Sequence, residues 1–377
     1  MHSAPLRDLT ILELGHSVAA PYAGLILAEL GARVIKVENP ETGDYARGWG
    51  PPFLDEDATA FHALNRGKES VTVDFSDPEQ LAMLKRMILS SDAVIQNLRP
   101  GLLTKFGIEV DEIRAEKPEL IWCDIGAFGN SGPLSKKPGY DPLAQASTGI
   151  MSITGELDRP PVRVGVSLVD MGSGMWTVIG LLSALIERNK SGEGAHVATS
   201  LFETGLGWMT IPLAAYAVSG EVRKPYGSGL AEIVPYQAFQ CSDGWVMIAA
   251  GNDKLFAKLC RAIPGLTEAG ADPRFQQNRD RVINRDALIP QIADAVRPMT
   301  MAEVGEALDR VQVPNCPLLA IDQVWAHPQT EAVGILADGG NHQWVGLPFS
   351  VDDKRPSSGG VAPTLGAHDD AIRQEFS

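Results

Sequence analysis

The spacing of apolar residues in the first 125 positions alternates between helix-like and strand-like segments. The helix-like segments are 20–31, which Gly31 closes, and 76–90, which a capping box from Ser76 to Glu79 opens. Short apolar or alternating segments of strand length lie at 9–15, 32–38, 70–75, 92–97 and 120–126. Strands that alternate with helices predict an α/β fold with a mostly parallel, doubly wound sheet. Ligands of such sheets bind beyond the carboxyl ends of the strands.

A carboxylate stands where two of these patterns meet. Every second residue from Val162 to Leu168 is apolar, which predicts a strand that ends near Asp170. From Ser173 onward apolar residues cover most of a helical circumference, so we expect a largely buried helix over 175–189. Asp170 then either caps this helix or takes part in chemistry, and the local pattern favours neither role. The helix N-terminus would keep its carboxylate ionised and available as a nucleophile.

The second half of the chain predicts a smaller domain. A capping box from Thr300 to Glu303 opens one helix, and a strand and two further helices are expected at 244–250, 253–260 and 285–296. We therefore expect a large domain over 1–200, a linker over 201–230, a small α+β domain over 231–319, and a C-terminal segment 320–377 that packs back on the large domain.

Composition narrows the classes of partner. The net charge of −15 argues against nucleic acid, because binding to phosphates needs a surplus of Lys and Arg. The four cysteines form no CxxC pair and have no His at metal-ligand spacing, so we expect reduced thiols and no metal site. The first ten residues contain no apolar signal core, and the longest apolar runs look too short to span a bilayer. We therefore expect a cytoplasmic protein without a membrane partner.

The loop after the first predicted strand lacks the dinucleotide-binding fingerprint. It reads GHSVAA where the turn over a pyrophosphate needs G-x-G-x-x-G, so NAD binding is not expected. His16 in this loop is a candidate base or a hydrogen-bonded turn residue, and the lack of a visible acidic partner favours the structural role. Six basic residues in loops or at element ends together indicate an anionic, phosphate-bearing ligand, although each alone is typical of a solvated surface: Arg66, Lys68, Arg99, Lys105, Lys136 and Lys137.

Several longer segments are similar to a known family. They read ILELGHSVAAPYAGLILAELGARVIKVENPETGDYARGW, NRGKESVTVDF, VIQNLRPGLLTKFGI, GYDPLAQASTG, DMGSGMWTVIGLLSALIERNKSGEGAHV and PTLGAHDDAI. Together they resemble the class III coenzyme A transferases, the formyl-CoA and carnitine-CoA transferase family, over nearly the whole chain. The resemblance implies a Rossmann-like large domain, a small domain, and two chains threaded through each other as an interlocked, ring-like homodimer. It also implies a coenzyme A (CoA) thioester donor and a small carboxylic acid acceptor as substrates, with no permanently bound cofactor.

The resemblance places the nucleophile at Asp170, the acid of the D-x-x-S-G-M stretch. Attack of this carboxylate on the thioester would give a mixed anhydride, which the released thiolate converts into an aspartyl-CoA thioester before the acceptor enters. The high-energy acyl bond is kept at every step, whereas a serine ester would lose it. Water must be excluded from both intermediates, so a covering loop is expected.

Carried over position by position, the resemblance implies CoA contacts in several loops. The implied contacts are Val18, Asn39, Val73, Asp74, Phe75, Ser76, Asn97, Leu98, Arg99, Lys105, Lys137 and Tyr140. Asn39 and Lys105 stand where the formyl-CoA pattern has arginine, so binding of the nucleotide would rest more on Lys than on bidentate Arg contacts. The glycine-rich lid of the formyl-CoA enzyme has no counterpart beyond YGSGL, which argues against oxalate and formate as the substrates.

Two other functions stay open at this point. α-Methylacyl-CoA racemases share the fold and the aspartate, but Tyr140 stands in place of their histidine base, and a phenol is a poor proton acceptor at neutral pH. The other alternative is a CoA-binding protein without catalysis, in which Asp170 only caps its helix. The sequence does not select the acid acceptor, and Arg163, Lys224 and the loop 227–236 are candidates for holding its second carboxylate.

Overall fold

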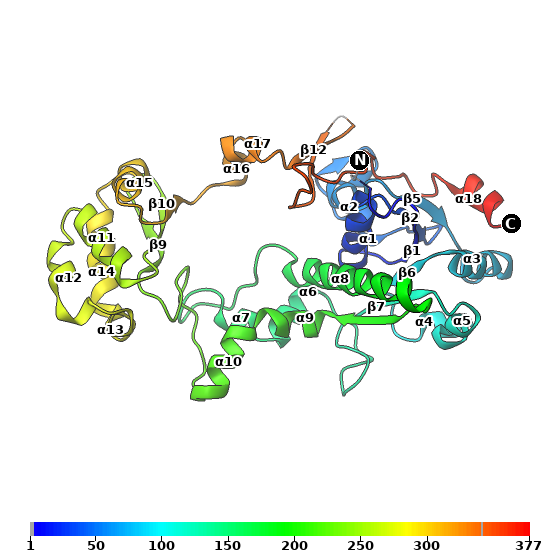
Figure 1. Cartoon of the computed structure of the whole chain (residues 1–377), viewed down its shortest axis with the longest axis horizontal. Helices are drawn as coiled ribbons and strands as arrows, with labels where there is room; N and C mark the ends of the chain where they lie inside the picture. The colour runs from blue at the N-terminus through cyan, green and yellow to red at the C-terminus, as the bar shows by residue number, and fades with distance from the viewer. Residues whose placement is uncertain (1–3, 341) are drawn as a thin grey trace. The chain divides into compact units, whose positions relative to one another are not determined.

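The computed structural model describes residues 4–340 and 342–377, which form two compact units. The first unit comprises the chain up to Ile150, Val164–Ile211 and Pro328–Ser377, and the second comprises Met151–Arg163 and Pro212–His327. Figure 1 labels many of the helices and strands of both units.

The first unit is built on a six-stranded parallel sheet (Figure 1). Its strands are β1 (Thr10–Leu14), β2 (Arg33–Glu38), β5 (Glu69–Thr72), β6 (Ala93–Gln96), β7 (Ile121–Gly126) and β8 (His196–Ser200). The spatial order β5-β2-β1-β6-β7-β8 is that of a Rossmann-like, doubly wound sheet, and it confirms the predicted fold class. The order reverses between β1 and β6, where such sheets open a crevice for ligands.

Helices cover both faces of this sheet. On one face α3 (Pro78–Ser90), α5 (Val110–Glu116) and the C-terminal α18 (Asp369–Glu375) bury apolar side chains against the strands. On the other face α1 (Ala19–Glu29) packs against α8 (Leu168–Ser191). The remaining helices of this unit are α2 (Thr59–Asn65), α4 (Leu102–Lys105), α6 (Asp141–Ser147), α9 (Leu201–Trp208), α17 (Pro328–Ala332) and the 3₁₀ helix η1 (Tyr45–Gly48). Two short hairpins, β3–β4 (Phe53–Leu54, Asp57–Ala58) and β12–β13 (Leu336–Gly339, His342–Val345), complete it.

The C-terminal segment belongs to the first unit from Pro328 onward and returns to the sheet, whereas residues 320–327 belong to the second unit. Asp369 accepts hydrogen bonds from the amide and hydroxyl of Thr72 at 2.7 and 2.6 Å, and the amide of His368 donates to the carbonyl of Ser70 at 3.0 Å. These bonds attach α18 to the edge strand β5 and cover part of its exposed backbone.

The second unit has its own antiparallel sheet and its own core. The strands run in the order β11 (Asn315–Pro317), β10 (Trp245–Ala249), β9 (Tyr236–Gln240). The helices are α10 (Thr210–Ser219, which starts in the first unit), α11 (Asp253–Ala262), α12 (Thr267–Ala271), α13 (Asn278–Ile283), α14 (Arg285–Val296), α15 (Met301–Arg310) and α16 (Ile321–Trp325), with the 3₁₀ helix η2 (Pro273–Phe275). The short helix α7 (Ile150–Ile153) begins at the boundary of the two units. The capping box at Thr300 and Glu303 is present as predicted. The range 201–230, expected as a linker, contains α9 and α10 before an irregular stretch.

The predicted strand over 162–168 is wrong. Residues 160–167 are irregular, and α8 already begins at Leu168, so Asp170 lies in the first turn of the helix rather than at the end of a strand. The alternating apolar residues include Val162 and Val166, which are 47% and 60% exposed, and no strand pairs with them among the described residues. Alternation without a partner strand leaves the backbone without ladder hydrogen bonds, so it does not make a strand.

The expectation that this helix is largely buried is also wrong. One side of α8 packs on α1, β7 and β8, but Met175, Trp176, Ile179 and Ile186 on its other side are 43–61% exposed. By length and composition α8 is the one helix in residues 4–340 and 342–377 that could cross a membrane, so the expectation that every apolar run is too short does not hold for it. Half of its most apolar window is buried within the protein.

A third correction concerns the start of α3. The N-cap is Asp77 rather than Ser76, and its side chain accepts from the amides of Glu79 and Gln80 at 2.9 and 3.4 Å. Ser76 instead donates from its hydroxyl to Asp74 at 2.6 Å. Asp is at least as good an N-cap as Ser, and Pro78 at the first helical position fixes the helix start one residue later.

Candidate active site

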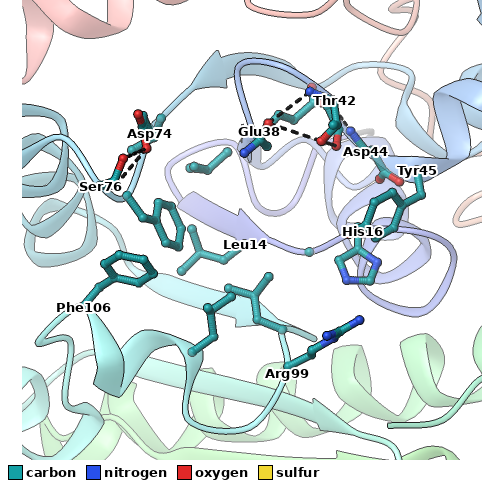
Figure 2. Close-up of a pocket in the computed structure, with 18 residues that line it drawn as sticks. Leu14, His16, Glu38, Thr42, Asp44, Tyr45, Asp74, Ser76, Arg99 and Phe106 are labelled. Atoms are coloured by element: carbon teal, nitrogen blue, oxygen red, sulfur yellow. Dashed lines mark hydrogen bonds between the residues drawn. The ribbon is translucent and has the colours of Figure 1, made fainter.

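Two adjoining cavities lie in the crevice where the strand order reverses. The first, of about 350 Å³, lies over the carboxyl ends of β1, β2 and β5 (Figure 2), and the second, of about 230 Å³, extends toward β7 and α8. Four residues line both cavities: His16, Tyr45, Leu98 and Arg99. The crevice therefore runs as one space from the edge of the sheet to the first turn of α8.

The β1–α1 loop that borders both cavities is held by two side chains. Asn97 accepts from the amide of His16 at 3.0 Å and donates to its carbonyl at 2.9 Å. Asp44 accepts from the amide of Ser17 at 2.8 Å, and Ser17 has a left-handed φ of 70°. In dinucleotide-binding sheets the amides of this loop and of the helix after it bind a pyrophosphate. Here the amides of His16 and Ser17 already have partners, so a phosphate in the crevice needs other donors.

A buried ion network underlies this loop. The ammonium of Lys36 contacts Glu13 at 2.8 Å, Asp44 at 2.7 Å and the carbonyl of Gly15 at 2.8 Å. Burial opposes the charge of Lys36, but Asp44 and Glu13 outweigh it and hold the pKa of the ammonium above its usual value. Lys68 contacts the other oxygen of Glu13 at 2.7 Å, and burial lowers its pKa to about 8. The network fixes β1, β2 and the loop together.

Two of the six basic residues thought to face a phosphate are thus not surface groups. Lys68 is fully buried against Glu13, and Arg66 is buried in an ion pair with Glu29 at 3.0 Å. Arg99 is exposed and lines both cavities, and Figure 2 shows its side chain reaching toward His16. Among the described residues its guanidinium has no hydrogen-bond or ion-pair partner, so Arg99 is available for an anion.

His16 is a turn residue with a ring in the crevice. Its Nδ1 lies 3.0 Å from the hydroxyl of Ser17, and its ring meets that of Tyr45 edge to face at 4.9 Å. Burial lowers the pKa of His16, and the attraction of Asp44 offsets this only in part. The imidazole is therefore neutral near pH 7, with its position set by the loop.

Asp170 lies at the far end of the crevice. It is half-buried, lines the second cavity, and its carboxylate accepts no hydrogen bond from any residue that the structure describes. Burial, and then the negative charge of Asp141, raise the pKa of Asp170 to about 7. With this pKa the carboxylate is only partly ionised near neutral pH, so the expectation that the helix terminus keeps it ionised is wrong.

A different carboxylate, that of Asp141, caps the helix. Asp141, at the start of α6, accepts from the amide of Val169 at 2.7 Å and from the amide of Asp170 at 3.2 Å. Its other oxygen accepts from Gln145 at 2.5 Å. Sequence reasoning missed Asp141; an Asp-Pro pair that opens a short helix in GYDP was the available signal, but its target lies 28 residues away.

Glycines let α8 begin close to its neighbours. A Cβ at Gly174 would lie 2.7 Å from the carbonyl oxygen of Ala19 in α1, and a Cβ at Gly172 would lie 2.9 Å from the ring of Trp208 in α9. The D-M-G-S-G stretch thus seats the first turns of α8 between two helices, and it fixes the backbone that carries Asp170.

The structure brings together most of the residues that the family resemblance singled out. The first cavity is lined by Asn39, Val73, Asp74, Phe75 and Ser76, the second by Val18, Asn97, Lys137, Tyr140 and Asp170, and both by Leu98 and Arg99. Lys105 lines neither cavity; it is exposed, with its ammonium 5.4 Å from the centre of the Phe106 ring.

Several of these side chains are already engaged in their loops. Asn39 accepts from the amides of Glu41 and Thr42 at 2.9 and 3.0 Å, so it forms a turn. Asp74 accepts from both the amide and the hydroxyl of Ser76. Phe75 meets Phe106 edge to face at 5.5 Å, and the two rings form an apolar floor in the first cavity, where Figure 2 labels Phe106. This cavity combines an apolar floor with polar groups around it, as small-molecule sites commonly do.

No group of three or more His, Cys, Asp or Glu side chains in residues 4–340 and 342–377 is arranged to hold a metal ion. All four cysteines are free thiols, and burial raises the pKa of Cys123, Cys241 and Cys260.

Comparison with known proteins shows the family of the chain. The chain matches the family model described as CoA-transferase family III over residues 6–369. It is 35% identical to a succinate–glutarate CoA-transferase of Agrobacterium fabrum, over 89% of this chain and 85% of that protein. It is also 35% identical to an acetyl-CoA:oxalate CoA-transferase of Acetobacter aceti, over 99% of this chain and 96% of that protein.

A solved structure shows the same fold. The crystal structure of a CaiB/BaiF family protein from Brucella suis is 37% identical, covers 99% of this chain and all of that one, and superposes with a TM-score of 0.89. Family match, sequence identity and fold agree over nearly the full length, and together they show that the chain is a transferase that belongs to CoA-transferase family III.

Proposed function

We propose that the protein moves CoA from an acyl-CoA donor to a carboxylic acid through covalent intermediates on Asp170. The observation that carries the proposal is the state of this side chain: it ends the crevice, is half-buried, and accepts no hydrogen bond from the described residues. A carboxylate that only capped its helix would be bonded to the helix amides, and Asp141 has taken that role.

The proposed transfer consists of four nucleophilic attacks, and each one forms one bond to a carbonyl carbon and breaks another. A carboxylate oxygen of Asp170 attacks the thioester carbonyl, the C–S bond breaks, and the CoA thiolate leaves a mixed anhydride behind. The thiolate then attacks the aspartyl carbonyl and releases the donor acid, which leaves an aspartyl-CoA thioester. The acceptor carboxylate attacks this thioester to form a second anhydride and free the thiolate. Attack of the thiolate on the acceptor carbonyl releases the new acyl-CoA and restores Asp170.

Only the ionised carboxylate is a nucleophile. With its pKa near 7, Asp170 is about half ionised at neutral pH, and its anion is poorly solvated and therefore reactive. We expect activity to rise with pH through this value and to level off above it.

The crevice supports a position for the donor. The apolar floor of Phe75 and Phe106 suits the adenine, and Arg99 and Lys137 are exposed cations for the phosphates. The thiol end would then reach Asp170 through the second cavity. The contacts expected at Val18, Asn39, Val73 to Ser76, Asn97, Leu98, Lys105 and Tyr140 belong to this proposal.

The acceptor is proposed to be a small dicarboxylate. Support comes from the acids in the names of the relatives, which include succinate, glutarate and oxalate.

Assembly and location are further parts of the proposal. We infer an interlocked homodimer, which the exposed apolar side of α8, including Trp176 and Ile186, supports. We infer a cytoplasmic location, which the four free thiols support, because reducing compartments keep thiols unpaired.

Trapping tests the covalent step. The protein is incubated with succinyl-CoA and hydroxylamine, and peptides are analysed by mass spectrometry for an aspartyl hydroxamate at Asp170. Asp170→Asn should abolish CoA exchange while circular dichroism stays unchanged, and Asp111→Asn, on the exposed first turn of α5, should keep both. Full exchange activity in Asp170→Asn would exclude the mechanism. Exchange of α-protons with solvent instead of CoA exchange would indicate a racemase.

A further inference from the structure

We propose that Asp141 is a positioning residue for Asp170: from α6 its carboxylate caps the first turn of α8 and so sets where the reacting carboxylate stands in the crevice. This inference rests on the proposed function of Asp170. It assigns a role to a side chain that itself lines neither cavity.

The hydrogen bonds of Asp141 show how it acts. Its Oδ2 accepts from the amides of Val169 and Asp170, at 2.7 and 3.2 Å, and the carboxylate is 2% exposed. Ser167 occupies the N-cap position of α8 but makes no side-chain cap bond. The cap is therefore supplied by a residue 28 positions away, and the bond ends on the backbone of the proposed nucleophile itself.

Gln145 holds Asp141 in turn. Its Nε2 donates to Oδ1 of Asp141 at 2.5 Å, and its Oε1 accepts from the amide of Val164 at 2.8 Å. Gln145 is fully buried and lies one turn after Asp141 on α6. Both oxygens of Asp141 are thus engaged, so the carboxylate has one orientation, and the segment that leads into α8 is attached to the same side chain.

Asp141 also acts on Asp170 through charge. After burial, the charge of Asp141 is the second cause of the raised pKa of Asp170. The other titratable groups around it do not share this effect: His16, Tyr45, Arg99, Lys137 and Tyr140 line the same cavity, Tyr22 lies on α1 and Glu203 on α9. One side chain therefore both positions the nucleophile and disfavours its anion.

Two variants separate these roles from a general loss of fold. Asp141→Asn keeps an oxygen for the two amides, removes the charge, and turns an NH₂ group toward the NH₂ of Gln145. Asp141→Asn with Gln145→Glu restores the pattern, because the glutamate can accept from the new amide and from Val164. In this double variant the negative charge is on residue 145, which contacts residue 141 and not Asp170. Asp111→Asn is again the control.

The readouts are kcat, the KM for succinyl-CoA, and the pH profile of each over about pH 5 to 9. We expect Asp141→Asn to lower kcat by about 10- to 100-fold, as misplacement of a reacting group does, with KM changed less than threefold. The rising limb of its pH profile should move to lower pH, because the neighbouring like charge is gone. The double variant should recover most of kcat.

Each result decides between the roles. The inference would be overturned if Asp141→Asn kept the pH profile of the unaltered protein and the single and double variants had equal kcat values. Loss of folded structure in both variants, measured by circular dichroism, would also overturn it. Hydroxylamine trapping in the unaltered protein keeps the two proposals apart. If Asp170 is not labelled there, the proposed function fails, and if it is labelled but the variants behave like the control, only the role of Asp141 fails.

Discussion

Asn97 bonds both backbone groups of His16, with its amide oxygen 3.0 Å from the His16 nitrogen and its amide nitrogen 2.9 Å from the His16 oxygen. One side chain after β6 thereby fixes the loop after β1, and the two loops border the crevice between them. A side chain that pairs with a backbone amide and carbonyl in this way behaves like a short piece of neighbouring strand.

We therefore expect Asn97→Ala to lower the free energy of unfolding by about 1 to 3 kcal/mol, because it leaves a partly buried donor and acceptor unpaired. The KM for the CoA thioester should rise, since the loop that borders both cavities loses its anchor. Urea denaturation and initial-rate kinetics measure the two effects. Asn39→Ala, which removes turn bonds on an exposed loop, should cost less than about 1 kcal/mol. Equal losses in the two variants would contradict this account.

Asp170→Asn should stabilise the fold at alkaline pH. The folded pKa of Asp170 is raised to about 7 from an ordinary value of 3.8, so its ionisation opposes folding. The penalty is absent below about pH 4, grows between about pH 4 and 7, and is complete above. We expect a gain of up to about 3 kcal/mol at pH 8 and almost none at pH 4, measured by chemical denaturation. A gain that is independent of pH would refute the link to ionisation.

Gly174→Ala should displace the start of α8. The added methyl would meet the carbonyl oxygen of Ala19 at 2.7 Å, and backbone cannot move aside cheaply. We expect a loss of about 1 to 3 kcal/mol in stability and a lower kcat, because Asp170 lies one turn before Gly174 in α8. Gly207→Ala on α9 is the matched control: it has open space and a helical setting, so it should be neutral or stabilising by up to about 1 kcal/mol. Thermal unfolding of both variants compares them directly.

Arg99→Ala should raise the KM for the CoA thioester by about tenfold or more, since a charge-assisted hydrogen bond to phosphate contributes roughly 1.5 to 3 kcal/mol. The salt dependence of KM should weaken along with it. Lys105→Ala should have a smaller effect, because Lys105 lines neither cavity. Kinetics at two ionic strengths measure this, and a larger effect at Lys105 would place the phosphates outside the crevice.

The sheet could be predicted from sequence because its signal is local. Strands β1, β2, β6 and β7 are short, largely apolar segments, and the prediction of β1, α1 and β2 needed only the spacing within residues 9–38. The segment before α8 shows where this reasoning ends. Val162, Val164 and Val166 alternate like a strand, but a strand also needs a neighbour, and the spacing says nothing about that.

Some residues of the candidate site could also be predicted from the sequence, and others could not. Asp170 stands out in the sequence because a carboxylate beside an apolar helix is unusual, and the family resemblance adds its role. The contact between Asp141 and the start of α8 could not be predicted from the sequence, because it depends on how α6 and α8 pack against each other. For the same reason the basic residues could not be sorted: Lys68 and Arg66 are buried partners of Glu13 and Glu29, while Arg99 faces the crevice.

The buried set of Glu13, Lys36, Lys68 and Asp44 constrains how this sequence can change over time. Removing one member strands an opposite charge in the interior, which costs about 3 to 5 kcal/mol and uses up much of the stability of an ordinary domain. A variant with all four positions apolar could be as stable as the present one, yet every single-residue path to it passes through a chain that scarcely folds. Replacement of this buried ionic set is thus blocked because the variants with one or a few substitutions are unstable, and not because the fully apolar variant would be.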